Sequence, residues 1–332
     1  MNYFCNFNSD YLSMNETLII STQIFILAIA VIVGVIAAKA GVISRESNSM
    51  LSKVILKISL PLMLFTNFFK LEVTPRLLTN SLITIALTAA VLLLLLFSGW
   101  ALTKIFKMPV REAAVFKAHS MLGNIIFIGF PLVYALYGKE GLLYASMFQL
   151  VSNILMWTVG VIILNQSNGT PWQQSIKKIF NPNTVATLLG LGFFIFAVKL
   201  PDIIITPLSG IGSANTWLCM MYIGAMMTFS NVRGLLRKKS IYIISLSRLL
   251  IMPALVILIF TILRTFAGVS FDALVLSVIV LEIAMPCMAM VVIMAHEFNA
   301  DAEMAMANVF VSTLLSIITL PAVIMMITRF LH

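Results

Sequence analysis

The chain has 332 residues, of which 61% are apolar and only 10% are charged. Soluble domains carry roughly 25% charged residues, so this composition excludes a soluble globular protein and predicts a membrane protein. The net charge is +9, but Lys and Arg stand mostly in short segments between apolar runs. That placement indicates membrane topology rather than binding of nucleic acid.

The apolar runs predict an all-α polytopic fold. A transmembrane helix needs roughly 20 apolar residues, whereas barrel strands give alternating segments of about 10 residues. No basic segment precedes the first run, so we expect it to be a retained span and not a removable signal peptide. The ten predicted spans are 18–38, 48–69, 77–103, 118–138, 141–164, 182–199, 207–231, 240–263, 273–295 and 304–328. Pro61 is expected to kink the second of them.

The distribution of basic residues predicts the orientation. Segments that follow odd-numbered spans, counted with Lys53 and Lys57 in the first half of span two, hold fourteen Lys and Arg residues, and the alternate segments, counted with Lys199 at the end of span six, hold six. The positive-inside rule therefore places both termini outside. The longest internal loop, 165–182, then lies on the cytoplasmic side, where it forms either a short interfacial helix around Trp172 and Phe180 or an ordinary loop.

A weak internal repeat divides the chain into two halves. Gly123-Asn124 in span four corresponds to Pro286-Cys287 in span nine, and each pair precedes an acidic turn and another span at similar spacing. Because each half has five spans, the halves would have opposite orientations. We expect a first repeat at 1–164, a loop at 165–182 and an inverted second repeat at 183–332. Matched interrupted helices are typical of the substrate sites of carriers.

Span four contains two glycines, an asparagine and a proline within nine residues. Such a segment forms either a kinked helix with close packing or a true break whose free N–H groups bind an anion. The matching break in span nine favours the second interpretation. The expected substrate-binding residues are Gly123, Asn124, Gly129, Pro131, Pro286, Cys287 and Met288.

Three ionisable residues within the predicted spans are candidates for a functional role. Glu282 is one turn before Pro286, where it could bind a proton or a cation or pair with Arg248. Arg248 could be a substrate counter-ion, the partner of Glu282, or a side chain that reaches the inner surface. His119 could relay protons or could simply be hydrogen-bonded.

The sequence favours neither an enzyme nor a metalloprotein. It has no HExxH, no GxSxG and no phosphate-binding glycine loop, and Cys5, Cys219 and Cys287 lie far apart. We therefore expect no cofactor apart from a coupling H⁺ or Na⁺. A membrane sensor without transport activity is the alternative from another class, although it would need an output domain that this chain lacks.

Several segments resemble the auxin efflux carrier family. They are GNIIFIGFPLVYALYGKEGLLYA (123–145), AMPCMAMVVIMAHEFNADAEMA (284–305), STLLSIITLP (312–321) and LPLMLF (60–65), with Asn181-Pro182, Arg248 and Pro253. The resemblance implies ten helices in two inverted halves, a fold similar to bile acid–sodium symporters, and broken helices four and nine that cross at the binding site. It also implies transport of carboxylates, such as malate, malonate or auxin.

Two positions depart from the pattern of the plant members. Gly123 stands where they have Pro, and Glu282 stands where they have Gln. The acidic residue is closer to the sodium-coupled relatives, and the short loop at 165–182 favours a bacterial-type permease. We expect a proton- or sodium-coupled carrier of small organic anions in a bacterial inner membrane, acting alone or as a homodimer. A carrier of the same fold for a larger amphipathic solute, such as a bile-acid-like molecule, is the alternative.

Overall fold

The computed structural model describes residues 25–26, 28–69, 74–165, 181–196, 198–229, 235–266 and 271–331. All regular structure in these residues is helical, as the composition predicts. The interfacial helix considered for the loop at 165–182 lies outside the described residues, apart from the ends of that loop.

The first half of the chain forms the helices that contain predicted spans one to five. After Ala28–Lys39, they are α2 (Arg45–Val54), η1 (Ile55–Ser59), α3 (Leu60–Phe68), α4 (Pro75–Ile105), α5 (Val110–Met121), η2 (Ile125–Gly129), α6 (Phe130–Leu155), η3 (Met156–Gly160) and α7 (Val161–Leu164). Helix α5 begins eight residues before the predicted span at 118–138, because its polar first turns extend beyond the apolar run.

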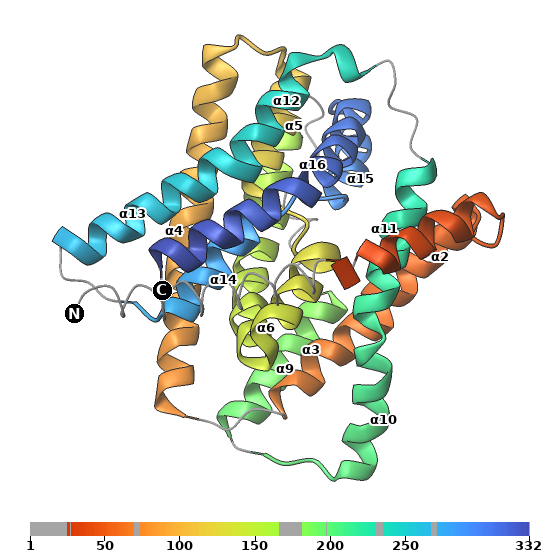
Figure 1. The fold of residues 1–332 in the computed structure, drawn as a ribbon, viewed down its shortest axis with the longest axis vertical. Coiled ribbons are helices and arrows are strands. Elements are labelled where there is room, and N and C mark those ends of the chain that lie inside the picture. Colours follow the sequence, from red (N-terminus) through yellow and green to blue (C-terminus); the bar gives the residue numbers. More distant parts are fainter. Residues whose placement is uncertain are drawn as a thin grey trace, which may run out of the picture.

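The second half of the chain also contains long helices and interrupted ones (Figure 1). Its helices are α9 (Pro182–Ile195), α10 (Asp202–Ser213), α11 (Asn215–Phe229), η5 (Leu235–Arg237), α12 (Lys239–Leu246), η6 (Ser247–Ile251), α13 (Met252–Phe266), α14 (Ala273–Ile283), α15 (Met290–Glu297) and α16 (Ala302–Phe330). The predicted span at 207–231 is thus two helices that meet at Ala214, a joint that hydropathy alone does not show.

Six helical segments are long and apolar enough to cross a membrane, and three shorter apolar helices accompany them. The segment Ile125–Leu164 has 40 residues, which at 1.5 Å per residue is about twice the thickness of a bilayer core. Gly138 interrupts it with φ 62° and ψ −147°, a conformation open to glycine, and separates the predicted spans four and five. The protein is a multi-pass membrane protein.

Polar side chains at the helix starts explain many of the boundaries. The side-chain oxygens of Ser, Thr, Asp and Asn accept hydrogen bonds from the first free N–H groups of a helix. Caps of this kind begin α2, α4, η2, α9, α14 and α16, at Ser44, Thr74, Asn124, Asn181, Asp272 and Asp301.

The segments η1, η2, η3 and η6 are π-helical turns, and a proline follows three of them at the same distance. Pro61, Pro131 and Pro253 each stand two residues after the last residue of η1, η2 and η6. A proline has no N–H group and clashes with the carbonyl four residues earlier, which in each case lies inside the wider turn. At Pro61, where the sequence predicted a kink, the structure has a π-helical turn before the proline, and the helix continues through it.

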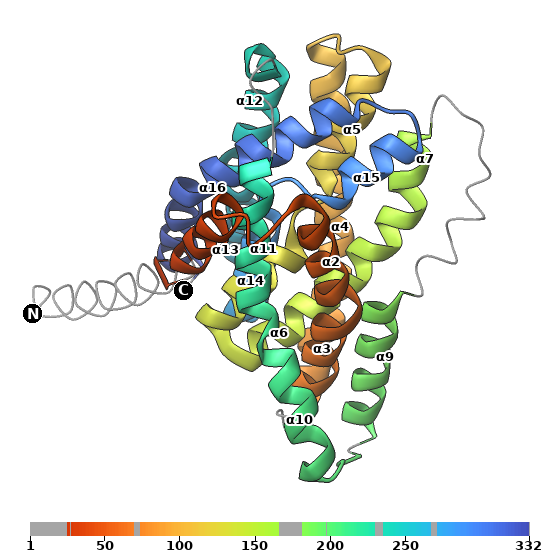
Figure 2. The ribbon, with the colours of Figure 1, turned by 90° about the vertical axis from the view of Figure 1, so that its right-hand side faces the viewer.

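The helix Ala28–Lys39, α2, α3, α9, α10 and α11 pack into one group, and glycines make several of its closest contacts. A Cβ at Gly34 would overlap the main chain of Met221, and one at Gly224 would overlap that of Val31. Gly212 lies as closely against the main chain of Met63. The other long helices, from α4 to α7 and from α12 to α16, pack mainly with one another (Figures 1 and 2).

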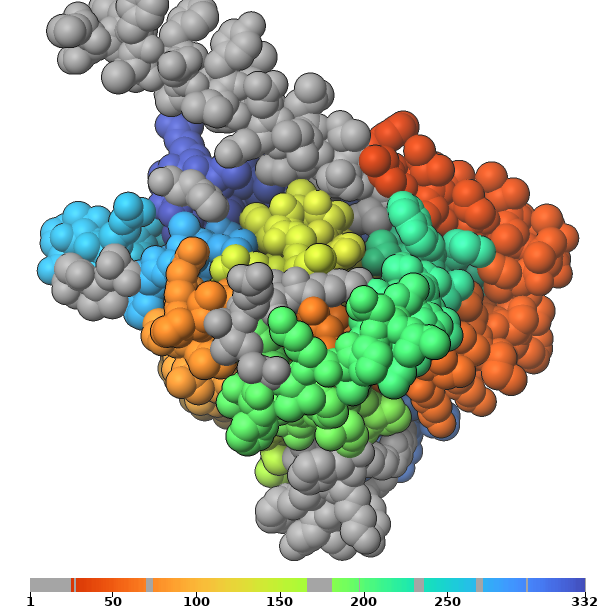
Figure 3. Space-filling model, turned by 90° about the horizontal axis from the view of Figure 1, so that it is seen from below, coloured from red at the N-terminus to blue at the C-terminus, as the bar shows by residue number. Residues whose placement is uncertain are grey.

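The turn at Gly138 divides α6. Seen from below in Figure 3, α6, in yellow, is exposed, and α9 and α10 are in green. The side-chain amide of Asn67 at the end of α3 donates to the carbonyl of Lys139, 3.1 Å away, and so connects the first group to this turn.

Candidate functional site

Two non-helical segments meet in the interior. Helix α5 ends at Met121 and η2 begins at Ile125, while α14 ends at Ile283 and α15 begins at Met290. Gly123 and Cys287 form an isolated antiparallel bridge, and the N–H of Asn124 donates to the carbonyl of Pro286 at 2.8 Å. The structure therefore brings together the two residue pairs that the sequence repeat matched.

Asn124 presents one free donor at this crossing. Its amide oxygen accepts from the N–H of Phe127 at 3.3 Å and caps η2. Its amide nitrogen has no hydrogen-bonding partner among the described residues, and the residue lines a cavity of about 470 Å³. A donor in that position can bind an acceptor oxygen of a solute.

The cavity lies between the two helix groups. Its lining residues are Arg45, Asn48, Ser49, Ser52, Leu56, Asn124, Ile126, Phe127, Tyr222, Met226, Phe229, Met288, Ala289, Met290, Val292, Ile293, Met306, Val309 and Phe310. The rings of Phe127 and Tyr222 stack with centroids 4.7 Å apart. Arg45 donates to the carbonyl of Phe229 at 2.6 Å. The walls are mainly apolar, with polar groups concentrated on α2.

Sequence reasoning missed the contribution of α2 and α11 to this cavity. Ser49 and Ser52 share one face of α2 with Arg45, at helical spacing. That polar stripe at the start of span two was the available signal. No comparable signal marks Tyr222, because the side chains of α11 are apolar on most faces.

Glu282 is fully buried in α14, and neither of its carboxylate oxygens has a hydrogen-bonding partner among the described residues. The carboxylate lies against Gly129, where an added Cβ would overlap it. It therefore forms no ion pair with Arg248, one of the roles considered from the sequence. Burying an unpaired charge is costly, so an ionised carboxylate in this place would need compensation.

Arg248 is 2% exposed and lies in η6. Its Nε donates to the carbonyl of Met285 at 2.6 Å, and its Nη1 donates to the carbonyls of His119 and Ser120 at 2.8 and 2.9 Å. It neither reaches the inner surface nor lines the cavity. Its side chain instead contacts both non-helical segments.

His119 is also buried, and both of its ring nitrogens are in contact with partners. Nε2 lies 3.3 Å from the carbonyl of Met288, and Nδ1 lies 3.1 Å from the amide nitrogen of Asn308. A carbonyl only accepts and an amide nitrogen only donates, so we assign the proton to Nε2. This arrangement favours the hydrogen-bonded interpretation of His119 over a proton relay.

The remaining predicted site residues are divided between the cavity and the interior. Met288 lines the cavity, whereas Pro131 lies buried in the first turn of α6. Cys287 is fully buried among apolar side chains, and its N–H donates to Ser312 Oγ at 3.0 Å. Its main chain belongs to the crossing, and its side chain points into the apolar interior. Among the described residues, no group of three or more His, Cys, Asp or Glu side chains could hold a metal ion.

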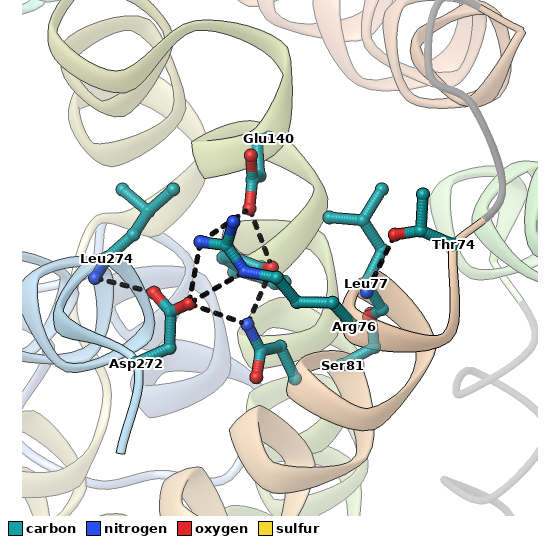
Figure 4. Close-up of polar contacts among 9 residues, drawn as sticks. Thr74, Arg76, Leu77, Ser81, Glu140, Asp272 and Leu274 are labelled. Carbon is teal, nitrogen blue, oxygen red and sulfur yellow. Dashed lines mark hydrogen bonds and ion pairs between the residues drawn. The ribbon is translucent and has the colours of Figure 1, made fainter. Parts of the chain in front are cut away.

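A second polar cluster joins three helices away from the cavity (Figure 4). Arg76 of α4 donates to Asp272 at 2.8 Å and lies 3.9 Å from Glu140 of α6. Asn80 donates both to Asp272 and to the hydroxyl of Tyr144, which in turn donates to Glu140. Desolvation raises the pKa of Asp272, but hydrogen bonds from Arg76, Leu274 N–H and Asn80, with the charge of Arg76, lower it below the usual 3.8.

The chain matches the family described as "Membrane transport protein" in two segments, residues 19–175 and 171–324. The chain belongs to this family. The match covers nearly the whole chain in two halves, and it confirms the resemblance to the auxin efflux carriers. The protein is a membrane transporter and not an enzyme.

Two archaeal relatives are also described as transporters. An uncharacterized transporter of Methanothermobacter thermautotrophicus is 26% identical over 298 residues, which cover 88% of this chain and 93% of the relative. An uncharacterized transporter of Methanocaldococcus jannaschii is 23% identical over 312 residues, covering 90% of this chain and 95% of the relative. Neither description names a substrate.

Proposed function

We propose that this membrane transport protein is a secondary carrier of small organic anions, mono- or dicarboxylates, that works by alternating access. The observation that carries the proposal is the free amide nitrogen of Asn124, which lines the cavity at the junction of two interrupted helices. The N-terminal end of η2 is beside it, and helix N-termini favour negative charge. A carboxylate could bind there without a buried lysine.

The proposed architecture is ten spans in two inverted repeats, 1–164 and 183–332, with both termini outside and the loop at 165–182 inside. Two family matches of similar length support two related halves. The crossing of α5–η2 with α14–α15 supports an interrupted helix in each half. We place the protein in a bacterial cytoplasmic membrane, and we propose a monomer or homodimer as the working unit.

We propose Glu282 as the coupling site for H⁺ or Na⁺. Its buried carboxylate without a partner supports this role, because transport can proceed only when the charge is compensated. Gly129 would leave space for the carboxylate of Glu282 with its bound H⁺ or Na⁺. Gly123, Pro286 and the Cys287 main chain would shape the crossing, and Met288 would contact the solute.

The apolar walls favour a second candidate substrate. Among the described residues that line the cavity, only Arg45, Asn48, Ser49, Ser52 and Asn124 contribute polar side chains other than the Tyr222 hydroxyl. A larger amphipathic carboxylate, with an apolar body against Phe127 and Tyr222, would match that lining better than a small dicarboxylate would.

Counterflow into proteoliposomes tests the proposal. Vesicles preloaded with malate, malonate, or an aromatic or bile-acid-like carboxylate should accumulate the same radiolabelled solute through the purified protein. Counterflow of a dicarboxylate but not of the amphipathic solutes supports the first candidate, and counterflow of an amphipathic solute but not of the dicarboxylates supports the second. A protein that carries none of these anions would contradict the proposal and favour a sensor.

Two substitutions of Asn124 separate binding from capping. Asn124→Asp keeps the oxygen that caps η2 but replaces the free donor with a negative charge, so apparent affinity for a carboxylate should fall about 10- to 100-fold. Asn124→Ala loses the cap as well, which should cost about 1 kcal/mol of stability. Normal affinity in Asn124→Asp would remove this residue from the site.

A further inference from the structure

Three main-chain carbonyls at the crossing share one donor side chain. The carbonyls of His119 and Ser120 belong to the last turn of α5, and that of Met285 follows α14. The last carbonyls of a helix have no N–H partner within it, and inside a membrane no bulk water replaces that partner. Arg248 supplies hydrogen bonds to all three from a third segment, η6.

The charge of Arg248 matches these carbonyl groups as well. Helix C-termini carry a partial negative charge, and here two of them point to the same place. The guanidinium lies against Gly123, where an added Cβ would overlap Nη2. Glycine at this position therefore leaves the space that the side chain occupies.

We infer that Arg248 is a positioning residue whose fixed positive charge holds the two interrupted helices together, in the place where a bound cation would otherwise be needed. It does so without contacting the solute, since it lies outside the residues that line the cavity. Only the consequence of this inference for transport rests on the proposed carrier function. The inference itself predicts that the two non-helical segments of the crossing separate when the charge of Arg248 is removed.

Cys287 reports on the crossing directly. It is fully buried and its residue pairs with Gly123, so separation of the two segments should expose its thiol. In a background with Cys5→Ser and Cys219→Ala, a small thiol reagent should label Cys287 slowly. Arg248→Ala should raise the labelling rate about tenfold or more, the change expected from losing hydrogen bonds to a charged group.

Chemical rescue distinguishes a charge effect from general loosening. Millimolar guanidinium should return the labelling rate of Arg248→Ala towards that of the parent, because it supplies the same planar donor. Urea has a similar shape without charge and should not, and sodium chloride at equal ionic strength controls for screening. Protection by urea to the same extent, or no protection by guanidinium, would overturn the inference.

A second substitution tests the same contact if Arg248→Ala does not fold. Gly123→Ala places a methyl group where Nη2 lies, so it should also raise the labelling of Cys287. Gly192→Ala in α9 is the matched control, because an added Cβ there meets nothing within 4 Å. Unchanged labelling in Gly123→Ala would contradict the inference. These tests measure the labelling of Cys287 and not transport. Their outcome is therefore independent of the outcome of the counterflow experiment.

Discussion

At the scale of single residues, the two glycines of the interrupted span four lie against the two buried charges. Gly123 makes room for the guanidinium of Arg248, and Gly129 makes room for the carboxylate of Glu282. Neither contact follows from helix propensity, which would merely count both glycines as weak points. The charges themselves lie apart: one is satisfied by carbonyls, and the other has no partner among the described residues.

Replacement of Glu282 tests the proposed coupling. Glu282→Gln keeps the shape but cannot carry a charge, so accumulation driven by an ion gradient should be lost while exchange of solute persists. Protein yield should remain close to normal, since no ion pair is broken. Both activities are measured in proteoliposomes with and without imposed gradients of H⁺ and Na⁺.

Glu303→Gln provides the control for this experiment. Glu303 is exposed in the first turn of α16, so the same chemical change there should leave both activities intact. Full gradient-driven accumulation by Glu282→Gln would show that coupling lies elsewhere. A large loss of yield would instead indicate that Glu282 supports the fold.

At the scale of elements, the start of α14 depends on a residue with two tasks. Asp272 caps the helix through the N–H of Leu274 at 2.9 Å, and it also binds Arg76. Asp272→Asn should keep the cap and lose the ionic contact. Because Arg76 is 67% exposed, solvent screens this contact, so the loss of stability at pH 7 should be small.

The pH dependence of this contact has a definite sign. The pKa of Asp272 is lowered in the folded state, so its contribution is complete above the usual value of 3.8 and is lost as the pH falls below it. Thermal unfolding in detergent should therefore separate the parent from Asp272→Asn at neutral pH and bring them together below pH 3.8. Asp272→Ala, which also loses the cap, should remain less stable than either across that range. A constant difference between the parent and Asp272→Asn would contradict this account.

At the scale of the whole molecule, the helices divide into two groups with the cavity between them. The first group is joined by glycines that approach neighbouring main chains, and the second contains both interrupted helices. Such a division would allow one group to move against the other during alternating access. The proposed orientation decides which side of the membrane the present cavity faces, because Arg45 would then lie on the cytoplasmic side.

Reporter fusions test this orientation. A reporter after Asn168 should be active only in the cytoplasm, and one at the C-terminus should be active only outside, as the fourteen-to-six bias of basic residues predicts. A C-terminus in the cytoplasm would rule out ten spans with both ends outside, and, if the reporter after Asn168 is in the cytoplasm as well, it would also contradict two inverted halves of five spans. The result does not depend on the substrate.

The sequence by itself determined the class of fold, the approximate places of the helices and the pair of segments that meet at the crossing. Apolar content and length decide the first two, because a chain crosses lipid either as long apolar helices or as a closed barrel of short alternating strands, and this sequence has the first pattern. The local signals were equally clear at Gly123, Asn124 and Pro286, since these residue types weaken a helix wherever they stand. Such properties belong to short stretches of chain and need no partner.

Only the tertiary structure decided what each buried polar group contacts. Arg248 and Glu282 are separated by 33 residues between them in sequence, and their chemistry alone suggested an ion pair. The folded chain instead directs Arg248 to carbonyls of α5, more than a hundred residues away, and leaves Glu282 beside Gly129. The cavity wall from α2 and α11 arises in the same way. Contacts between distant segments depend on how whole helices pack, and no local pattern of residues encodes that packing.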